Sequence, residues 1–150
     1  MAALLRAIFF AVLLAAESTA VSAVEVSPVG RWRTIDAETG ADNGLIEITS
    51  TGDTLEGRIV RMVMKPGEAP DPICEKCEGA QKGQRVLGLT ILRGFRRDGD
   101  VWDGGTILDP WTGSLYSAQL RLDETGNKLF VRGYLGIPLL GRTQTWLRGN

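Results

Sequence analysis

Two alternating apolar segments flank one strong turn sequence in the middle of the chain, within residues 101–122. Asp109 can accept hydrogen bonds from backbone amides two residues further on, and Pro110 fixes φ at the second position of a turn. Gly113 can adopt the positive φ that returns the chain to a neighbouring strand. The alternate side chains that follow are mainly apolar and share one face: Tyr116, Ala118, Leu120 and Leu122. This stretch therefore predicts a half-buried β-hairpin.

The same combination of short alternating segments and turn residues recurs from residue 29 to residue 148. We expect strands at residues 29–35, 45–51, 55–64, 86–96, 101–108, 116–122, 128–135 and 142–148. Further hairpin turns are predicted at residues 51–53, 97–100 and 124–127, each of which contains a glycine. No intervening stretch has a helix-length apolar stripe with a period of about 3.6 residues. The fold class is therefore all-β.

Short strands that are mostly joined by hairpins predict an up-and-down meander. A meander removes its exposed edges most simply when it closes on itself. We therefore expect a small antiparallel meander β-barrel, and a two-sheet sandwich is the alternative that the same pattern permits. In a barrel of about eight strands, the interior is either filled by side chains or holds one small ligand. Both interiors stay open at this point.

The N-terminal residues have the composition of a secretory signal peptide. Arg6 gives a short positive region, residues 7–16 are apolar, and a Val-Ser-Ala sequence that ends at Ala23 fits the small-residue rule for cleavage. The apolar run is about half of the roughly 20 residues that a membrane-spanning helix needs. We expect a signal peptide at residues 1–23 and an exported barrel domain at residues 24–150, periplasmic or secreted and without a membrane span.

The net charge of −1 and the lack of histidine narrow the function classes. A balanced charge provides no field that draws a protein onto nucleic acid, so no nucleic-acid partner is expected. Histidine is the commonest general base and a frequent metal ligand. Asp103 and Asp109 can share a strand face if no bulge intervenes, although a turn cap and a solvated carboxylate are the commoner outcome. We expect no catalytic residue, no metal and no cofactor.

The longest connection, residues 65–85, contains three prolines and both cysteines of the chain. A loop of this length is either a lid over the barrel mouth or a solvated excursion that a disulfide holds. In an exported chain, Cys74 and Cys77 are expected to form a structural disulfide. A redox pair would need a helix N-terminus to lower the pKa of a thiol. A zinc site would need ligands from a second chain or from neighbouring carboxylates.

The last two predicted strands carry the candidate ligand contacts, which are Arg132, Tyr134, Arg142, Gln144 and Trp146. The first two share one strand face, and the last three share one face of the next strand. If both faces point inward, they form a polar cluster that can orient an anionic or amide-bearing ligand. Alternatively, the arginines stack on Trp32 or Trp146 and plug one end of the barrel.

Several short motifs are spread over nearly all of the chain that follows the predicted signal peptide. They lie at residues 30–32 (GRW), 88–92 (GLTIL), 102–105 (WDGG), 132–134 (RGY) and 141–146 (GRTQTW). Together they resemble the bacterial domain-of-unknown-function 2147 family, whose members are exported proteins without an assigned activity. The resemblance implies a lipocalin-like or calycin-like barrel. The opening Gly-x-Trp with a late arginine is also similar to lipocalins.

Three functional hypotheses follow from these patterns. We favour a non-enzymatic barrel that binds a small ligand or a peptide segment in the periplasm. The second hypothesis is a structural or interaction protein of the cell envelope, with a filled barrel whose outer face meets another protein. The third is an enzyme, either a redox protein that uses Cys74 and Cys77 or a carbohydrate-active protein.

Overall fold

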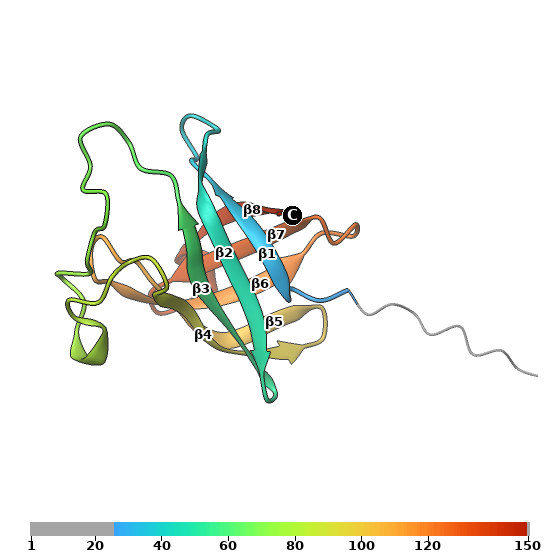
Figure 1. Ribbon diagram of the computed structural model, residues 1–150. Coiled ribbons are helices and arrows are strands. Elements are labelled where there is room, and N and C mark those ends of the chain that lie inside the picture. The colour runs from blue at the N-terminus through green and yellow to red at the C-terminus, as the bar shows by residue number, and fades with distance from the viewer. Residues whose placement is uncertain (1–25, 150) are drawn as a thin grey trace, which may run out of the picture.

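Eight antiparallel strands form a closed barrel in the computed structural model, which describes residues 26–149 (Figure 1). The strands are β1 Gly30–Ile35, β2 Asp42–Thr51, β3 Thr54–Met62, β4 Thr90–Asp98, β5 Val101–Leu108, β6 Leu115–Leu122, β7 Lys128–Tyr134 and β8 Arg142–Arg148. Each strand pairs with the next along the chain, and β8 pairs with β1. The up-and-down barrel predicted from the sequence is confirmed, and the sandwich is not formed.

Two short 3-10 helices, η1 (Gly79–Gln81) and η2 (Pro138–Leu140), lie in connections between strands. Among residues 26–149, no helix has both the length and the apolar character required to cross a membrane. The predicted signal peptide and its cleavage site fall outside the described residues.

The β5–β6 hairpin forms as its turn residues predict. The Asp109 carboxylate accepts a hydrogen bond from the backbone amide of Trp111 at 2.9 Å. Gly113 has a φ of +73° and donates its amide to the Asp109 carbonyl at 2.8 Å. Ala118 and Leu120 are buried, so the alternate face of β6 faces the interior.

The predicted strand at residues 86–96 begins too early, because the chain turns before it enters the sheet. Gly88 has a φ of +91°, and the amide of Leu89 donates to the Val86 carbonyl at 3.1 Å. β4 therefore starts at Thr90. Val86 and Leu89 are nevertheless buried, so their apolar character reflects packing against the barrel rather than strand pairing.

Large apolar side chains fill one half of the barrel interior. They include Trp32, Ile48, Leu55, Leu92, Phe95, Trp102, Leu120 and Leu129, all of which are buried. Two glycines make this packing possible. A Cβ on Gly105 would lie 2.5 Å from the ring of Phe95, and a Cβ on Gly57 would lie 2.8 Å from Leu92 Cδ1. Close approach of the backbone at these positions is what admits the larger side chains opposite them.

Arg148 closes the filled end of the barrel. Its guanidinium lies 4.2 Å from the centre of the Trp32 ring, in a cation–π arrangement. It also donates hydrogen bonds to the carbonyls of Gly126 at 2.7 Å, Ser27 at 3.0 Å and Val29 at 3.2 Å. An arginine does stack on Trp32, as one hypothesis proposed, but it is Arg148 rather than either arginine considered from the sequence.

The long connection between β3 and β4 is fixed to the turn that joins β5 and β6. Cys74 and Cys77 form the predicted disulfide, and their exposed fractions are only 0% and 2%. Cys74 Sγ lies 3.1 Å from the Pro110 carbonyl oxygen. On the same turn, Gly113 faces the backbone of Lys76 so closely that a Cβ there would overlap the Lys76 carbonyl. The connection is therefore a compact, disulfide-held segment that borders one side of the barrel mouth.

Candidate ligand-binding cavity

A cavity of about 1060 Å³ occupies the other half of the barrel. Alternate strands of an up-and-down barrel run in opposite directions, so β1, β3, β5 and β7 end at the same end of the barrel, where the following strands begin. The cavity lies at this end. Arg148 is at the end of β8 and therefore at the opposite end of the barrel. The cavity is slightly larger than the range of about 300–1,000 Å³ that is common for small-molecule sites.

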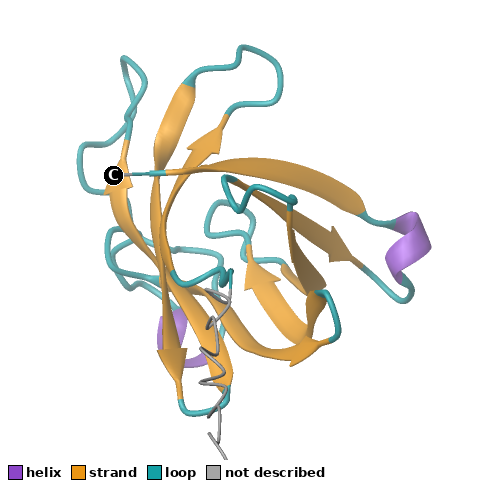
Figure 2. Cartoon of the chain, turned by 90° about the vertical axis from the view of Figure 1, so that its right-hand side faces the viewer, coloured by secondary structure: helices purple, strands orange, loops and turns teal. Residues whose placement is uncertain are grey.

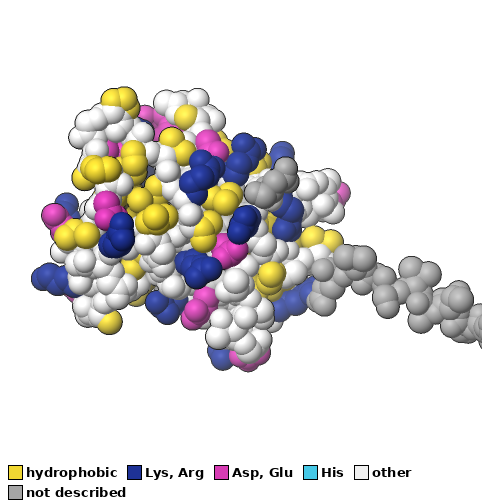
Figure 3. All heavy atoms as spheres, in the orientation of Figure 1, with side chains coloured by type: hydrophobic (Ala, Val, Ile, Leu, Met, Phe, Trp, Pro, Cys, Tyr) yellow, Lys and Arg dark blue, Asp and Glu magenta, His cyan; other side chains and the backbone are white. Residues whose placement is uncertain are grey.

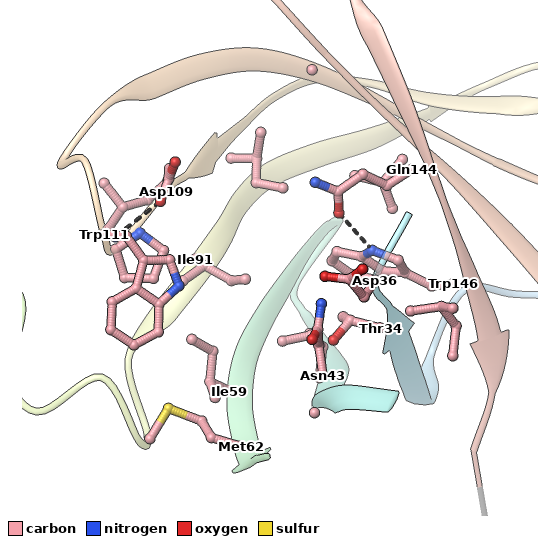
Figure 4. A pocket seen from close by; sticks show the side chains of 18 of the residues that line it. Thr34, Asp36, Asn43, Ile59, Met62, Ile91, Asp109, Trp111, Gln144 and Trp146 are labelled. Carbon is pink, nitrogen blue, oxygen red and sulfur yellow. Dashed lines mark hydrogen bonds between the residues drawn. The ribbon is translucent and has the colours of Figure 1, made fainter. Parts of the chain in front are cut away.

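The deeper wall of the cavity is apolar. Its side chains include Ile46, Ile59, Ile91, Ile107 and Val131, which come from five different strands. Trp146 lines the same space, and its exposed fraction is 2% (Figure 4). A ligand in this space would therefore contact aliphatic side chains on several sides and one indole.

Gln144, on β8, is one of the polar side chains of the cavity lining. Its Oε1 accepts a hydrogen bond from Trp146 Nε1 at 3.0 Å, as the dashed line in Figure 4 marks. Gln144 pairs across the sheet with Val131, and both belong to the cavity lining. It is solvent-exposed in spite of this inward position, so water reaches the cavity. Within residues 26–149, the amide N–H groups of Gln144 have no hydrogen-bond acceptor.

Arg142 stands on the same face of β8, one step nearer the mouth. It pairs with Gly133, which has no side chain to fill the space opposite it. The guanidinium makes no hydrogen bond or ion pair with the described part of the chain, and it lines the cavity. Arginine presents several N–H donors in a fixed plane that suits carboxylate or phosphate oxygens. Arg142 is thus available for an anionic or carbonyl group of a ligand.

Charges around the mouth are balanced. The charged residues of the lining are Asp36, Glu68, Asp109, Arg61, Lys65 and Arg142. Arg61 pairs with Asp42 at 2.8 Å, and Lys65 lies 3.9 Å from Asp36. Hydrogen bonds from Thr39 hold the pKa of Asp36 below its usual value, and a hydrogen bond from Arg61 does the same for the pKa of Asp42. Most of these charges are therefore committed to the structure of the rim.

The structure brings four of the five sequence-predicted contacts to the cavity. Tyr134, Arg142, Gln144 and Trp146 belong to its lining, whereas Arg132 does not. Strand register places Arg132 on the other face, because it pairs with Thr143, which alternates with Arg142 and Gln144. Tyr134 alternates with Arg132 on that same face, and it belongs to the lining as the last residue of β7. The Arg132 guanidinium instead binds the connection between β7 and β8, with Nε 2.6 Å from the Pro138 carbonyl oxygen.

Most of the apolar lining was not identified from the sequence. Alternation indicates which positions of a strand share a face, but it does not tell which of them face empty space. Asp103 and Asp109 do not form an acid–base pair. The register shifts between Trp102 and Gly105, Asp103 accepts a hydrogen bond from Gln119 at 2.8 Å, and Asp109 caps the β5–β6 turn. Among residues 26–149, no group of three or more metal-ligating side chains is placed to hold a metal ion.

A family model described as an uncharacterized protein conserved in bacteria, domain of unknown function 2147, matches residues 30–148. The chain belongs to this family. The matched range runs from the first residue of β1 to the last residue of β8, so the DUF2147 match covers the whole barrel.

Among solved structures, this DUF2147 chain is similar to protein HP1028 from the human pathogen Helicobacter pylori, which belongs to the lipocalin family. The TM-score is 0.69 at 16% sequence identity, and the match covers 83% of this chain and 84% of that chain. At this identity the likeness establishes a shared lipocalin-like barrel fold. Among curated protein sequences, none matches this chain.

Proposed function

We propose that this DUF2147 protein is an exported, non-enzymatic barrel that binds one small, mainly apolar ligand in the open half of its interior. Its main support is the cavity of about 1060 Å³, which is open to solvent and has both apolar and polar side chains in its lining. A cell-envelope protein that used only its outer face would not need such a space. The filled-barrel hypothesis is therefore less well supported.

The lining suggests how such a ligand would be oriented. An apolar body would pack against Ile59 and Ile91, which are buried, and against Ile107, which packs on the core. A carboxylate, sulfonate or carbonyl group at its other end would face Arg142 and the amide of Gln144. Because both polar residues stand on β8 at alternate positions, one polar group can contact both of them.

The Cys74–Cys77 disulfide does not favour a redox function. Thiol–disulfide exchange begins with a thiolate that attacks one sulfur along an open path. Here both half-cystines are buried, and the Pro110 carbonyl lies against Cys74 Sγ. The disulfide is better placed to hold the β3–β4 connection beside the mouth.

Binding of two fluorescent dyes tests the proposal. The neutral dye N-phenyl-1-naphthylamine probes the apolar cavity, and 8-anilinonaphthalene-1-sulfonate adds an anionic group. We expect both to bind the folded protein with one site each. Ile107→Trp should block both dyes, because the larger side chain fills the cavity. Arg142→Gln should weaken only the sulfonate dye, by about tenfold, which corresponds to loss of one charge-assisted hydrogen bond.

Arg93→Gln is the matched control, because it removes the same charge from an exposed position of β4 outside the cavity lining. It should leave both affinities unchanged. Failure of both dyes to bind, or full binding by a folded Ile107→Trp variant, would contradict the proposal. Native mass spectrometry of protein purified from its own host would then identify a retained ligand. The intact mass of the same sample tests cleavage after Ala23.

A further inference from the structure

An uncharged segment projects beside the mouth of the barrel. Residues 133–141 contain no charged side chain, and Leu139 and Leu140 of η2 are 80% and 76% exposed. Leu135 and Ile137 are also exposed. In Figure 2, η2 stands out from the barrel wall just before β8, the strand that leads to the C-terminal marker. We refer to residues 135–140 as the leucine turn.

Several backbone groups at η2, within the leucine turn, are hydrogen-bonded inside the protein. Arg132 donates to the carbonyls of Pro138 at 2.6 Å and Leu139 at 3.2 Å. The amides of Leu140 and Gly141 donate to the carbonyls of Ile137 at 3.2 Å and Pro138 at 3.0 Å. A backbone group without a partner is costly in a hydrocarbon environment. The turn can therefore enter an apolar phase without losing hydrogen bonds to water at these groups.

Other exposed apolar side chains surround the same opening. Val63, Trp111, Leu135 and Leu140 all line the cavity and are all exposed, and we refer to these four as the apolar rim. Apolar side chains also gather at the upper left of Figure 3, where the loops of the mouth lie in Figure 1. Tryptophan favours the boundary between water and lipid, where its ring is buried and its N–H stays hydrated.

We propose that the apolar rim and the leucine turn dock onto a phospholipid surface, with the mouth of the barrel toward the lipid. The leucine turn has no polar side chain, whereas a protein interface usually has about one hydrogen bond per 100–200 Å² and is enriched in tyrosine and arginine. A lipid phase requires no such partners. An apolar ligand can then pass between the bilayer and the cavity without crossing water, a step that rests on the proposed function.

The balanced charge of the mouth narrows the class of lipid. Asp36, Glu68 and Asp109 stand against Arg61, Lys65 and Arg142 in the cavity lining. Because the charges of the lining cancel, electrostatic attraction of the cavity mouth to anionic lipids contributes little. Docking therefore depends on apolar burial. It occurs on zwitterionic vesicles and is insensitive to salt.

Flotation with phosphatidylcholine vesicles tests the docking surface. Wild type and variants are expressed from the full reading frame and carry the same N-terminus, so a difference in flotation reports only the substitutions. We expect the wild type to float with the vesicles at low and high salt. The double variant Ile137→Ser/Leu139→Ser changes two exposed residues that do not line the cavity, and it should lower the partition coefficient about 100-fold, which is about 2.8 kcal/mol at 1.4 kcal/mol per tenfold change. Emission from Trp111, identified with a Trp111→Phe variant, should shift to the blue on binding.

Val29→Ser is the matched control, because Val29 is 42% exposed at the end of the barrel that Arg148 closes. It should change the partition coefficient by less than about twofold. Unchanged thermal unfolding and unchanged binding of N-phenyl-1-naphthylamine verify that the double variant still folds. This dye result also separates a failure of docking from a failure of the proposed ligand site.

Three results would overturn the docking proposal. In the first, folded wild type stays in solution with all vesicles. In the second, binding requires anionic lipid at low salt or is unaffected by the two serine substitutions. In the third, sedimentation shows a dimer of this chain that the double variant dissociates and that vesicles do not disrupt, which assigns the leucine turn to self-association.

Discussion

Gly113→Ala is the substitution that most directly tests how the β3–β4 connection is held. Gly113 has a φ of +73°, a conformation that costs an L-residue about 1 kcal/mol. A Cβ at this position would also overlap the Lys76 carbonyl oxygen and lie 2.5 Å from the Lys76 carbonyl carbon. Both groups at the clash are backbone, so rotation of a side chain cannot relieve it. The segment around Cys77 must therefore move away from the β5–β6 turn.

The expected cost is about 3 kcal/mol. The conformational part is about 1 kcal/mol. Moving the segment exposes two half-cystines that are almost completely buried, and each contributes about 1 kcal/mol of apolar burial. Gly99→Ala is the matched control, because Gly99 has a φ of +63° and a Cβ added there would have no neighbouring atom within 4 Å. It should lose only the conformational part.

Two measurements separate these contributions. Urea denaturation of both variants gives the difference in the free energy of unfolding, which should be about 2 kcal/mol between them. Reduction of the Cys74–Cys77 disulfide by dithiothreitol under native conditions should become at least tenfold faster in Gly113→Ala, because the sulfurs become accessible. Gly99→Ala should be reduced at the wild-type rate. Equal unfolding energies and equal reduction rates in the two variants would refute docking of the segment on this turn.

Three further predictions concern the barrel itself. Arg148→Met should lower the free energy of unfolding by about 3 kcal/mol in urea, because it removes charge-assisted hydrogen bonds and the contact with Trp32; a loss below about 0.5 kcal/mol would contradict this. Gly105→Ala should cost about 2 kcal/mol through overpacking against Phe95, and adding Phe95→Leu should recover part of that loss if the clash is the cause. The melting temperature should be nearly constant from about pH 8 to 5, since the chain has no histidine, and should fall below about pH 4. Hydrogen bonds from Thr39 and Arg58 hold the pKa values of Asp36 and Glu47 lower in the folded state, so the unfolded chain takes up more protons in acid. A fall in the melting temperature centred near pH 6 to 7 would contradict this assignment.

Local sequence was sufficient to predict the strands and their order. Turn residues such as Asp109 and Gly113 act within a few positions of themselves, and alternation reports the pleat directly. Hairpins between consecutive strands then leave few topologies other than a meander. The early start predicted for β4 shows the limit, because Val86 and Leu89 are apolar for packing rather than for pairing.

The candidate site was less predictable because it depends on long-range register. Alternation indicates which residues of one strand share a face, but it does not relate the face of β7 to that of β8. Arg132 and Arg142 were therefore placed together, although their pairing partners put them on opposite faces. The position of the open half depends on where Phe95 and Leu92 stop filling the interior, and the glycines that admit them, Gly105 and Gly57, lie on neighbouring strands.

The even number of strands has a practical consequence for handling the protein. β1 begins and β8 ends at the side where Arg148 binds the carbonyls of Ser27 and Val29, so neither end of the described chain lies near the opening. A surface linker or a fused reporter attached at either end would sit behind the barrel. Immobilised molecules would then present their openings to the bulk solution, in one common orientation.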